Sequence, residues 1–123
     1  MKAVFDTNIL IDYLNGEKAA LKELSLYESK FISVVTQIEI LVGTSNTQEE
    51  AMIRSFLASF KLKQLTADIA ERTVRIRKEY RMKIPDAIVY ATAREEGCIL
   101  VTRNTKDMKE DWPDVRVPYQ LNG

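Results

Sequence analysis

The sequence predicts an α/β fold of three layers, in which helices cover both faces of a mostly parallel central sheet. Short apolar runs alternate along the chain with longer segments of helical periodicity, a pattern typical of parallel α/β sheets. Residues 98–101 form an unbroken apolar run, as expected for a central strand that is covered on both faces. The 123 residues suffice for one core, so we expect residues 1–123 to form a single domain.

The strands are expected where short apolar or β-branched runs end at polar residues. Such runs occur at residues 2–5, 31–34, 62–65 and 98–101. Six helices are expected, over residues 8–15, 19–27, 36–42, 48–60, 66–81 and 85–96. Gly16, Gly43 and Gly97 follow three of these helices, and Pro85 suits the first turn of the last one.

Two of these helices have faces that can be assigned from their apolar residues. In the helix 19–27, Leu21, Leu24 and Tyr27 are expected on one face. The helix 36–42 is rich in isoleucine, leucine and valine, so we expect most of it to be buried, with Glu39 in a narrow polar strip.

The composition excludes several classes of protein. The chain has no histidine, which rules out a serine–histidine–aspartate triad and histidine-ligated zinc. Lysine plus arginine and aspartate plus glutamate are equal, at 18 each, so a nucleic-acid partner needs a local basic patch. The single cysteine, Cys98, is expected in the core and suits a reducing cytoplasm. Neither a secretion signal nor a membrane span is predicted, and we expect a cytoplasmic protein.

Carboxylates occur where the predicted strands end or where helices begin. Asp6 ends the first strand, Glu39 lies in the helix after the second, and Asp86 lies in the first turn of the helix 85–96. Asn104 and Asp107 follow the last strand. Because ligands bind beyond the carboxyl ends of parallel strands, we expect these side chains to meet at one edge of the sheet.

Each carboxylate also has an ordinary structural interpretation. Asp6 could cap the next helix, Asp86 could complement a helix dipole, and Glu39 and Asp107 could lie in solvent. Together, however, converging carboxylates repel one another unless a cation is present. Oxygen ligands without histidine or cysteine suit Mg²⁺ or Mn²⁺, and such ions support hydrolysis of phosphodiesters.

Four segments in order resemble the PIN-domain family, and within it the VapC-like ribonuclease toxins of type II toxin–antitoxin systems. The segments are FDTNILI, ISVVTQIEIL, IPDAIVYATA and LVTRNTKD, at residues 5–11, 32–41, 84–93 and 100–107. The resemblance implies a PIN-like α/β/α domain and a Mg²⁺- or Mn²⁺-dependent endoribonuclease that cuts tRNA or another structured RNA. It further implies a homodimer and a cognate antitoxin protein that covers the acidic site.

The resemblance assigns roles to particular residues. Metal ligands are expected at Asp6, Glu39 and Asp86, and Asp107 completes the catalytic set. Many relatives carry an acid directly after Thr102-Arg103, where this chain has Asn104, so the fourth acidic position is open between Asn104 and Asp107. The side chains expected to bond the ligands or to touch the substrate are Thr7, Asn8, Thr36, Thr102, Arg103 and Asn104.

The densest basic stretch runs from Arg72 to Lys83 and contains six basic residues and one acid, Glu79. Phosphate contact is one interpretation of this stretch, and a solvated helix face is the other. Trp112 and Tyr119 could stack on bases, or they could pack at an edge of the fold or form a dimer contact.

Three rival functions remain to be weighed. A haloacid-dehalogenase-like phosphatase needs a second aspartate at position 8, where Asn8 stands. A phosphate-receiver module needs adjacent acids after the first strand, which are absent. A catalytically weakened PIN-like module that binds RNA or protein is the main alternative, and only Asn104 supports it.

Overall fold

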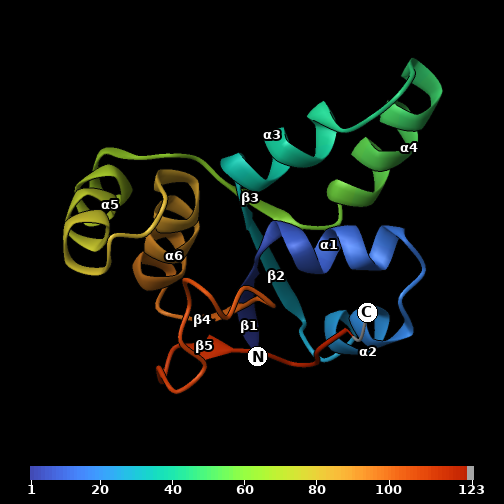
Figure 1. Ribbon diagram of the computed structural model, residues 1–123. Coiled ribbons are helices and arrows are strands. Elements are labelled where there is room, and N and C mark those ends of the chain that lie inside the picture. The colour runs from blue at the N-terminus through green and yellow to red at the C-terminus, as the bar shows by residue number, and fades with distance from the viewer. Residues whose placement is uncertain (122–123) are drawn as a thin grey trace.

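A five-stranded sheet runs through the centre of the computed structural model, which describes residues 1–121 (Figure 1). The strands are β1 (Lys2–Phe5), β2 (Ser29–Ser33), β3 (Lys61–Lys63), β4 (Ile99–Val101) and β5 (Val115–Arg116). Their order is β3-β2-β1-β4-β5, and every pairing is parallel. The chain first adds strands on one side of β1 and then returns to its other side, so the topological switch point lies between β1 and β4.

Helices cover both faces of this sheet, as the sequence predicts (Figure 1). They are α1 (Thr7–Leu14), α2 (Lys18–Leu24), α3 (Val34–Val42), α4 (Thr47–Leu57), α5 (Ala67–Tyr80) and α6 (Ile84–Glu96). The pair α5 and α6 packs on one side, and α1 and α2 lie on the other, with α3 and α4 projecting beyond the sheet. The expected three-layer α/β/α architecture is confirmed; residues 122–123 of the expected domain lie outside the described part.

The alternation of side chains along the strands creates two cores. Val4 and Leu100 point into the core beneath α5 and α6, whereas Phe5 and Val101 point into the core shared with α1 to α4. Successive residues of a strand face opposite sides of a sheet, which is why apolar runs such as Ile99–Val101 are needed in a sheet covered on both faces. Burying each of these larger side chains stabilises the fold by about 1.5–3 kcal/mol.

The helix boundaries follow the local signals in the sequence. Ser33 caps α3 by accepting a hydrogen bond from the Val35 amide, and Pro85 lies in the first turn of α6. The helix ends at Gly97, whose φ of 64° is in the left-handed region that glycine occupies without strain.

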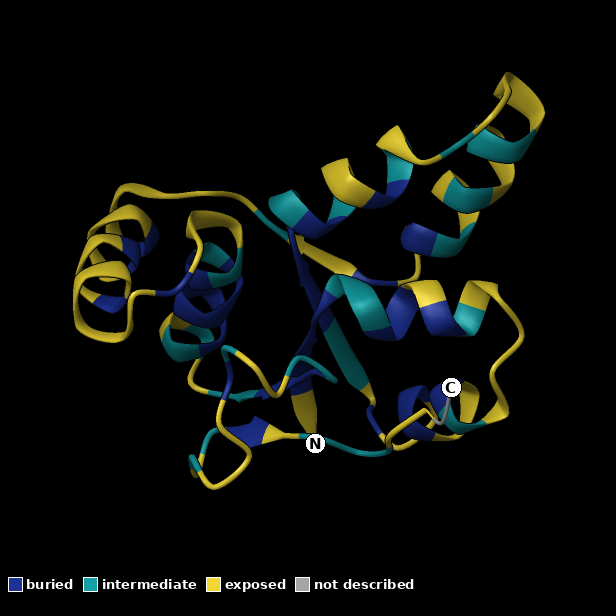
Figure 2. Ribbon diagram, viewed as in Figure 1, coloured by how far each residue is buried: buried dark blue, intermediate teal, exposed yellow. Residues whose placement is uncertain are grey.

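One predicted face is wrong in part, and another is wrong. Leu24 and Tyr27 are buried as expected, but Leu21 is 55% exposed and the buried face of α2 contains Glu23. In α3 only Thr36 and Ile40 are buried, while Val42 is 78% exposed (Figure 2). The reason in the second case is position: α3 projects beyond the sheet, so only the side turned toward α1 and α6 finds packing partners.

The strand β5 was not expected from the sequence. Only two residues form it, and they pair with β4 through main-chain bonds such as that from the Thr102 amide to the Arg116 carbonyl, at 3.0 Å. The expected core position of Cys98 holds in part, since this residue is partly buried and packs against the α5–α6 core. No helix within residues 1–121 has the length and apolar character needed to cross a membrane.

Candidate active site

Asp6 lies at the carboxyl end of β1 and is buried, with 4% of its surface exposed. Its backbone amide donates to the Val101 carbonyl of β4 at 2.9 Å, which fixes the residue at the switch point. Its Oδ1 accepts a hydrogen bond of 2.8 Å from the Thr7 amide and so begins α1. The helix cap expected for this aspartate is therefore present, and it leaves the other carboxylate oxygen available.

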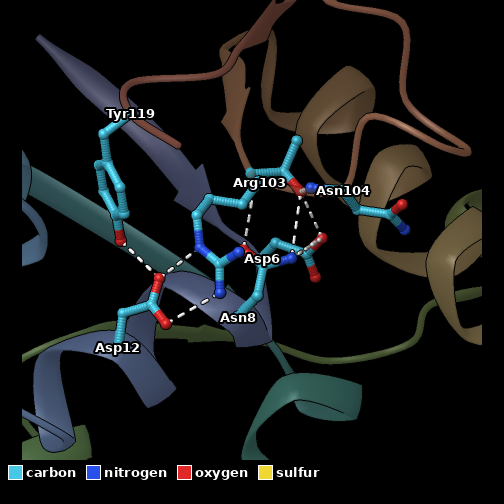
Figure 3. Close-up of polar contacts among 7 residues, drawn as sticks. Asp6, Asn8, Asp12, Arg103, Asn104 and Tyr119 are labelled. Carbon is cyan, nitrogen blue, oxygen red and sulfur yellow. Dashed lines mark hydrogen bonds and ion pairs between the residues drawn. The ribbon is translucent and has the colours of Figure 1, made fainter. Parts of the chain in front are cut away.

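The second oxygen of Asp6 is bound by two neutral side chains from different elements (Figure 3). The Thr102 hydroxyl, which follows β4, donates to Asp6 Oδ2 at 2.8 Å. The Asn8 amide, in the first turn of α1, donates to the same oxygen at 3.3 Å. Burial raises the pKa of Asp6, the bonds from Thr102 and Thr7 oppose the rise, and the Glu39 charge adds to it.

Glu39 and Thr36 reach this edge from α3. The Thr7 hydroxyl donates to Glu39 Oε1 at 2.7 Å and lies 3.1 Å from the Thr36 hydroxyl oxygen. Thr36 is fully buried, whereas Glu39 is exposed. The expectation that Glu39 lies in an otherwise buried helix is wrong, because the outer side of α3 is open. The Glu39 carboxylate is consequently solvated, and its one hydrogen bond joins it to the residue after Asp6.

Asp86 lies in the first turn of α6. Partial burial, the negative charges of Asp6, Asp107 and Glu39, and a hydrogen bond with Asp107 together raise its pKa to about 6. Thr7 joins Asp6 to Glu39 through hydrogen bonds, and the charges of Asp6, Asp107 and Glu39 act on Asp86, so the four carboxylates lie at the same edge of the sheet. The sequence prediction that these residues share one edge of the sheet agrees with this geometry.

Asn104 and Asp107 form one turn after β4. The Asn104 amide nitrogen donates to Asp107 Oδ2 at 3.1 Å, and the Asp107 backbone amide donates to Asn104 Oδ1 at 3.3 Å. The Asn104 backbone amide donates in turn to the Thr102 hydroxyl at 2.9 Å. Asn104 thus orients Asp107, and the turn carries Asp107 toward Asp86.

The four carboxylates have no positive partner within the described chain. None of the ion pairs among residues 1–121 includes Asp6, Glu39, Asp86 or Asp107. The same residues are not gathered tightly enough for any three acidic side chains to form a ready-made metal cage. The edge therefore holds net negative charge that only neutral hydrogen-bond donors and the amino ends of α1 and α6 offset.

Three residues that the sequence offered for substrate contact are engaged elsewhere. The Arg103 guanidinium binds Asp12 through Nη2 at 2.9 Å and through Nε (Figure 3). The Trp112 ring stacks on Tyr90, with ring centroids 5.3 Å apart, and the Tyr119 hydroxyl donates to Asp12 at 2.8 Å. Edge packing, the alternative weighed for the two aromatic residues, is what the structure shows.

Two buried acids were missed. Asp12 and Glu23 are each 4% exposed. Glu23 accepts bonds from Arg116 Nε at 2.6 Å and Nη2 at 2.9 Å, with Tyr27 donating at 2.9 Å. Asp12 is bound by Arg103 and Tyr119 in the same way. A signal existed, because each acid is in phase with the buried side of its helix, but the arginine partners are 91 and 93 residues away in the sequence and cannot be read from it.

The PIN domain family matches residues 3–110 of this chain. Among characterised relatives, the chain is 31% identical to the tRNA(fMet)-specific endonuclease VapC of Shigella flexneri, over 91% of this chain and 98% of the relative. It is also 31% identical to Ribonuclease VapC1 of Methanocaldococcus jannaschii, over 85% of this chain and 77% of the relative.

Solved structures agree with this match. A toxin–antitoxin complex from Klebsiella pneumoniae contains a chain that is 42% identical, with a TM-score of 0.91 over 97% of this chain and 99% of that chain. The FitAcB structure from Neisseria gonorrhoeae is 20% identical, with a TM-score of 0.81 over 97% of this chain and 99% of that chain, and shares the fold.

Proposed function

Because the chain belongs to the PIN-domain family, we propose that it is a VapC-type endoribonuclease, the toxin of a toxin–antitoxin pair, which hydrolyses RNA with Mg²⁺ or Mn²⁺. The observation that carries this proposal is the placement of four carboxylates near the switch point of the sheet, with no lysine or arginine paired to them among residues 1–121. A haloacid-dehalogenase-like phosphatase and a receiver module receive no support from the family match.

The chemistry of the donors fits a hard divalent cation. The residues present offer carboxylate oxygens and no histidine or thiolate, a set that suits Mg²⁺ or Mn²⁺. Asp6, Glu39 and Asp86 are the proposed ligands, with Asp107 as the fourth acid. Closing around an ion needs small side-chain movements, and the exposed Glu39 is the residue best able to make them. When bound, such an ion supplies Lewis-acid polarisation of the phosphate and activation of water.

The remaining residues are proposed to hold the acids in place. Thr102 and Asn8 bond the Asp6 carboxylate, and Thr7, packed beside Thr36, bonds Glu39. These donors fix the charged oxygens before substrate arrives, which lowers the cost of reorganisation during the reaction. Asn104 does the same for Asp107, so we propose that Asp107 provides the fourth negative charge.

The proposed substrate is tRNA or another structured RNA. This choice is supported by the name of the Shigella flexneri relative, a tRNA-specific endonuclease. The basic stretch on α5 supports RNA binding only in part. Two of its side chains already have partners in the chain: Arg72 pairs with Glu95, and Arg77 bonds the Met82 carbonyl. Arg103 is not proposed as a contact to RNA, since Asp12 occupies its guanidinium.

A cognate antitoxin is the proposed protein partner, in line with the Klebsiella pneumoniae complex. A hollow of about 260 Å³ beside Glu39 has the apolar walls Ile11, Leu14, Ile40 and Ile53, so a partner that docks there would also cover the acidic edge. The homodimer and the cytoplasmic location expected from the sequence stay predictions.

The test is cleavage of total tRNA by the purified chain in Mg²⁺, in Mn²⁺ and in EDTA, with Asp6→Asn and Asp86→Asn alongside. We expect discrete products that require the metal. In both variants we expect the rate of cleavage to fall by about 100-fold or more, because loss of groups that support a metal lowers activity by up to about that factor. Asp68→Asn is the matched control, because Asp68 also lies in the first turn of a helix but is exposed and remote from this edge.

Each outcome has a definite meaning. Metal-dependent cleavage that both site variants lose and the control keeps would establish the proposal. Cleavage of equal rate in all four proteins would assign it to a contaminant. Absence of cleavage together with absence of Mn²⁺ binding would favour the alternative, a catalytically weakened PIN-like binding module.

A further inference from the structure

Asn8 and Asp12 lie one helical turn apart on α1, and both bind Arg103 (Figure 3). Asn8 Oδ1 accepts a hydrogen bond of 3.0 Å from the Arg103 backbone amide. Asp12 binds the guanidinium of the same residue through both carboxylate oxygens. The helix α1 therefore binds Arg103 at two points, its backbone amide and its guanidinium.

The contact between Asp12 and Arg103 is rigid. Two parallel bonds between a guanidinium and a carboxylate fix distance and orientation together. The Asp12 side chain is 6% exposed and that of Arg103 is 25% exposed, so water competes little for either group. The Tyr119 hydroxyl adds a third bond to the Asp12 carboxylate at 2.8 Å.

Arg103 connects this contact to the candidate active site. Because the Asn8 amide is planar, an N–H bond to its oxygen directs its nitrogen toward Asp6 Oδ2 and the Thr102 hydroxyl, each at 3.3 Å. Thr102 immediately precedes Arg103 and donates the shortest side-chain bond to Asp6. Movement of Arg103 would therefore displace both side-chain donors of the Asp6 carboxylate.

We propose that Asp12 is a positioning residue for the candidate active site: by holding Arg103, it keeps Asn8 and Thr102 directed at Asp6. The inference rests on the proposed function for the reaction itself. Within the described residues, the Asp12 side chain bonds Arg103 and Tyr119 and none of the four acids of the site. Its loss should lower kcat and the affinity for Mn²⁺ by about 10- to 100-fold, as loss of supporting bonds to a ligand does, with KM for RNA little changed.

Glu23 provides a matched control within the same chain. Like Asp12, it is a buried carboxylate that takes two bonds from one arginine and one from a tyrosine. The guanidinium of its arginine, Arg116, makes no bond to any side chain of the site within the described residues; Arg116 meets the site only through its main-chain carbonyl, which accepts from the Thr102 amide. Glu23→Gln should lower thermal stability as Asp12→Asn does, because each leaves an arginine without its counter-charge, but it should leave Mn²⁺ affinity and kcat within about threefold of wild type.

The experiment compares Asp12→Asn, Glu23→Gln and Arg103→Lys with wild type. For each protein, thermal unfolding, Mn²⁺ affinity by titration calorimetry, and kcat and KM on total tRNA are measured below the unfolding temperature. Arg103→Lys retains the charge and the backbone N–H but loses the two-bond geometry, so we expect an intermediate effect on Mn²⁺ affinity. If Asp12→Asn does not fold, Arg103→Lys against Glu23→Gln decides the question.

A measurement without metal or RNA separates this inference from the proposed function. In the metal-free protein, the NMR signals of the Arg103 backbone amide and the Asn8 side-chain amide report their mutual bond. We expect both signals to shift in Asp12→Asn and in Arg103→Lys and to stay in place in Glu23→Gln. Shifts without RNA cleavage by wild type would sustain the positioning role and reject the proposed function.

The opposite pattern would overturn the inference. If Asp12→Asn and Arg103→Lys change Mn²⁺ affinity and the two amide signals no more than Glu23→Gln does, Asp12 only stabilises the fold. Cleavage by wild type would then leave the proposed function intact.

Discussion

Asp6, Asp12 and Glu23 are equally buried, at 4% exposure each, but their surroundings differ in charge. Asp12 and Glu23 each have an arginine and a tyrosine. Asp6 has only the neutral donors Thr7, Asn8 and Thr102, and the nearest charges that influence it are negative. Buried carboxylates therefore have a positive partner in one region of the protein and only neutral donors in the other.

The difference separates carboxylates that hold the fold from those available for chemistry. A buried charge is costly unless it is paired, so the chain supplies Arg103 and Arg116 where the acid has a structural task. At the carboxyl edge of the sheet, no positive side chain offsets the cost of burying the charged carboxylates, and the pKa values of Asp6 and Asp86 are raised as a result. An external cation is the partner that would neutralise them.

The largest expected effect is on the free energy of unfolding, when one glutamate of each region is replaced by glutamine. Glu23→Gln should lower the free energy of unfolding by about 1–3 kcal/mol, less than a fully buried pair because the Arg116 side chain is 45% exposed. Glu39→Gln should change stability by less than about 0.5 kcal/mol, since Glu39 is exposed. Urea unfolding checks both values, and RNA cleavage should show the reverse order. Equal stability losses would contradict the division into two regions.

A smaller effect is expected for Asp86→Asn, which should change how the stability of the metal-free protein depends on pH. The ordinary pKa of this carboxyl is 3.8 and its folded pKa is about 6. Between these values the folded state binds more protons than the unfolded state, so this group makes stability fall as pH rises, and the full cost is present above pH 6.

Asp86→Asn removes that cost. We expect its Tm to exceed that of wild type by a few degrees above about pH 6 and to equal it below about pH 4. Adding Mg²⁺ should raise the Tm of wild type more than that of the variant, and both trends are read from thermal scans across pH. A variant that is less stable than wild type at neutral pH would show that Asp86 is not under repulsion.

The smallest effect is expected from Asn104→Asp, which supplies the acid that the resemblance to the PIN-domain family leads one to expect there. The bond from Asn104 to Asp107 would be replaced by repulsion between two carboxylates. We expect tighter Mn²⁺ binding, by several-fold because ligand charge increases, together with a slightly lower metal-free Tm. Asn46→Asp is the control, since Asn46 caps α4 and aspartate caps as well. Unchanged Mn²⁺ affinity in Asn104→Asp would mean that position 104 lies outside the ion's reach.

Much of the fold was predictable because local signals agree with the packing. Apolar runs identified β1 and β4, and Pro85 and Gly97 bounded α6. The two-residue β5 was not predictable, since its main-chain pairing with β4 leaves no periodic pattern. The exposure of α3 was mispredicted because an apolar sequence does not tell whether a neighbouring element will cover it.

The site was predictable for residues whose place follows from topology. Asp6 and Asp107 come after strands that are neighbours in a parallel sheet, and Asp86 begins the helix between them. The engagement of Arg103 was not predictable, because its partner lies 91 residues away and the sequence shows only that an arginine stands beside the site. Long-range pairing of single charges carries no sequence periodicity.

The partners of Asp12 and Glu23 emerge late during synthesis. Glu23 precedes Arg116 by 93 residues, and Asp12 precedes Tyr119 by 107. A nascent chain on the ribosome therefore carries these two acids without their arginine partners until most of the described chain has been made. A ribonuclease built in this order acquires its finished architecture only when translation of that chain is almost over, so incomplete products lack the bonds that order α1, α2 and the end of β4.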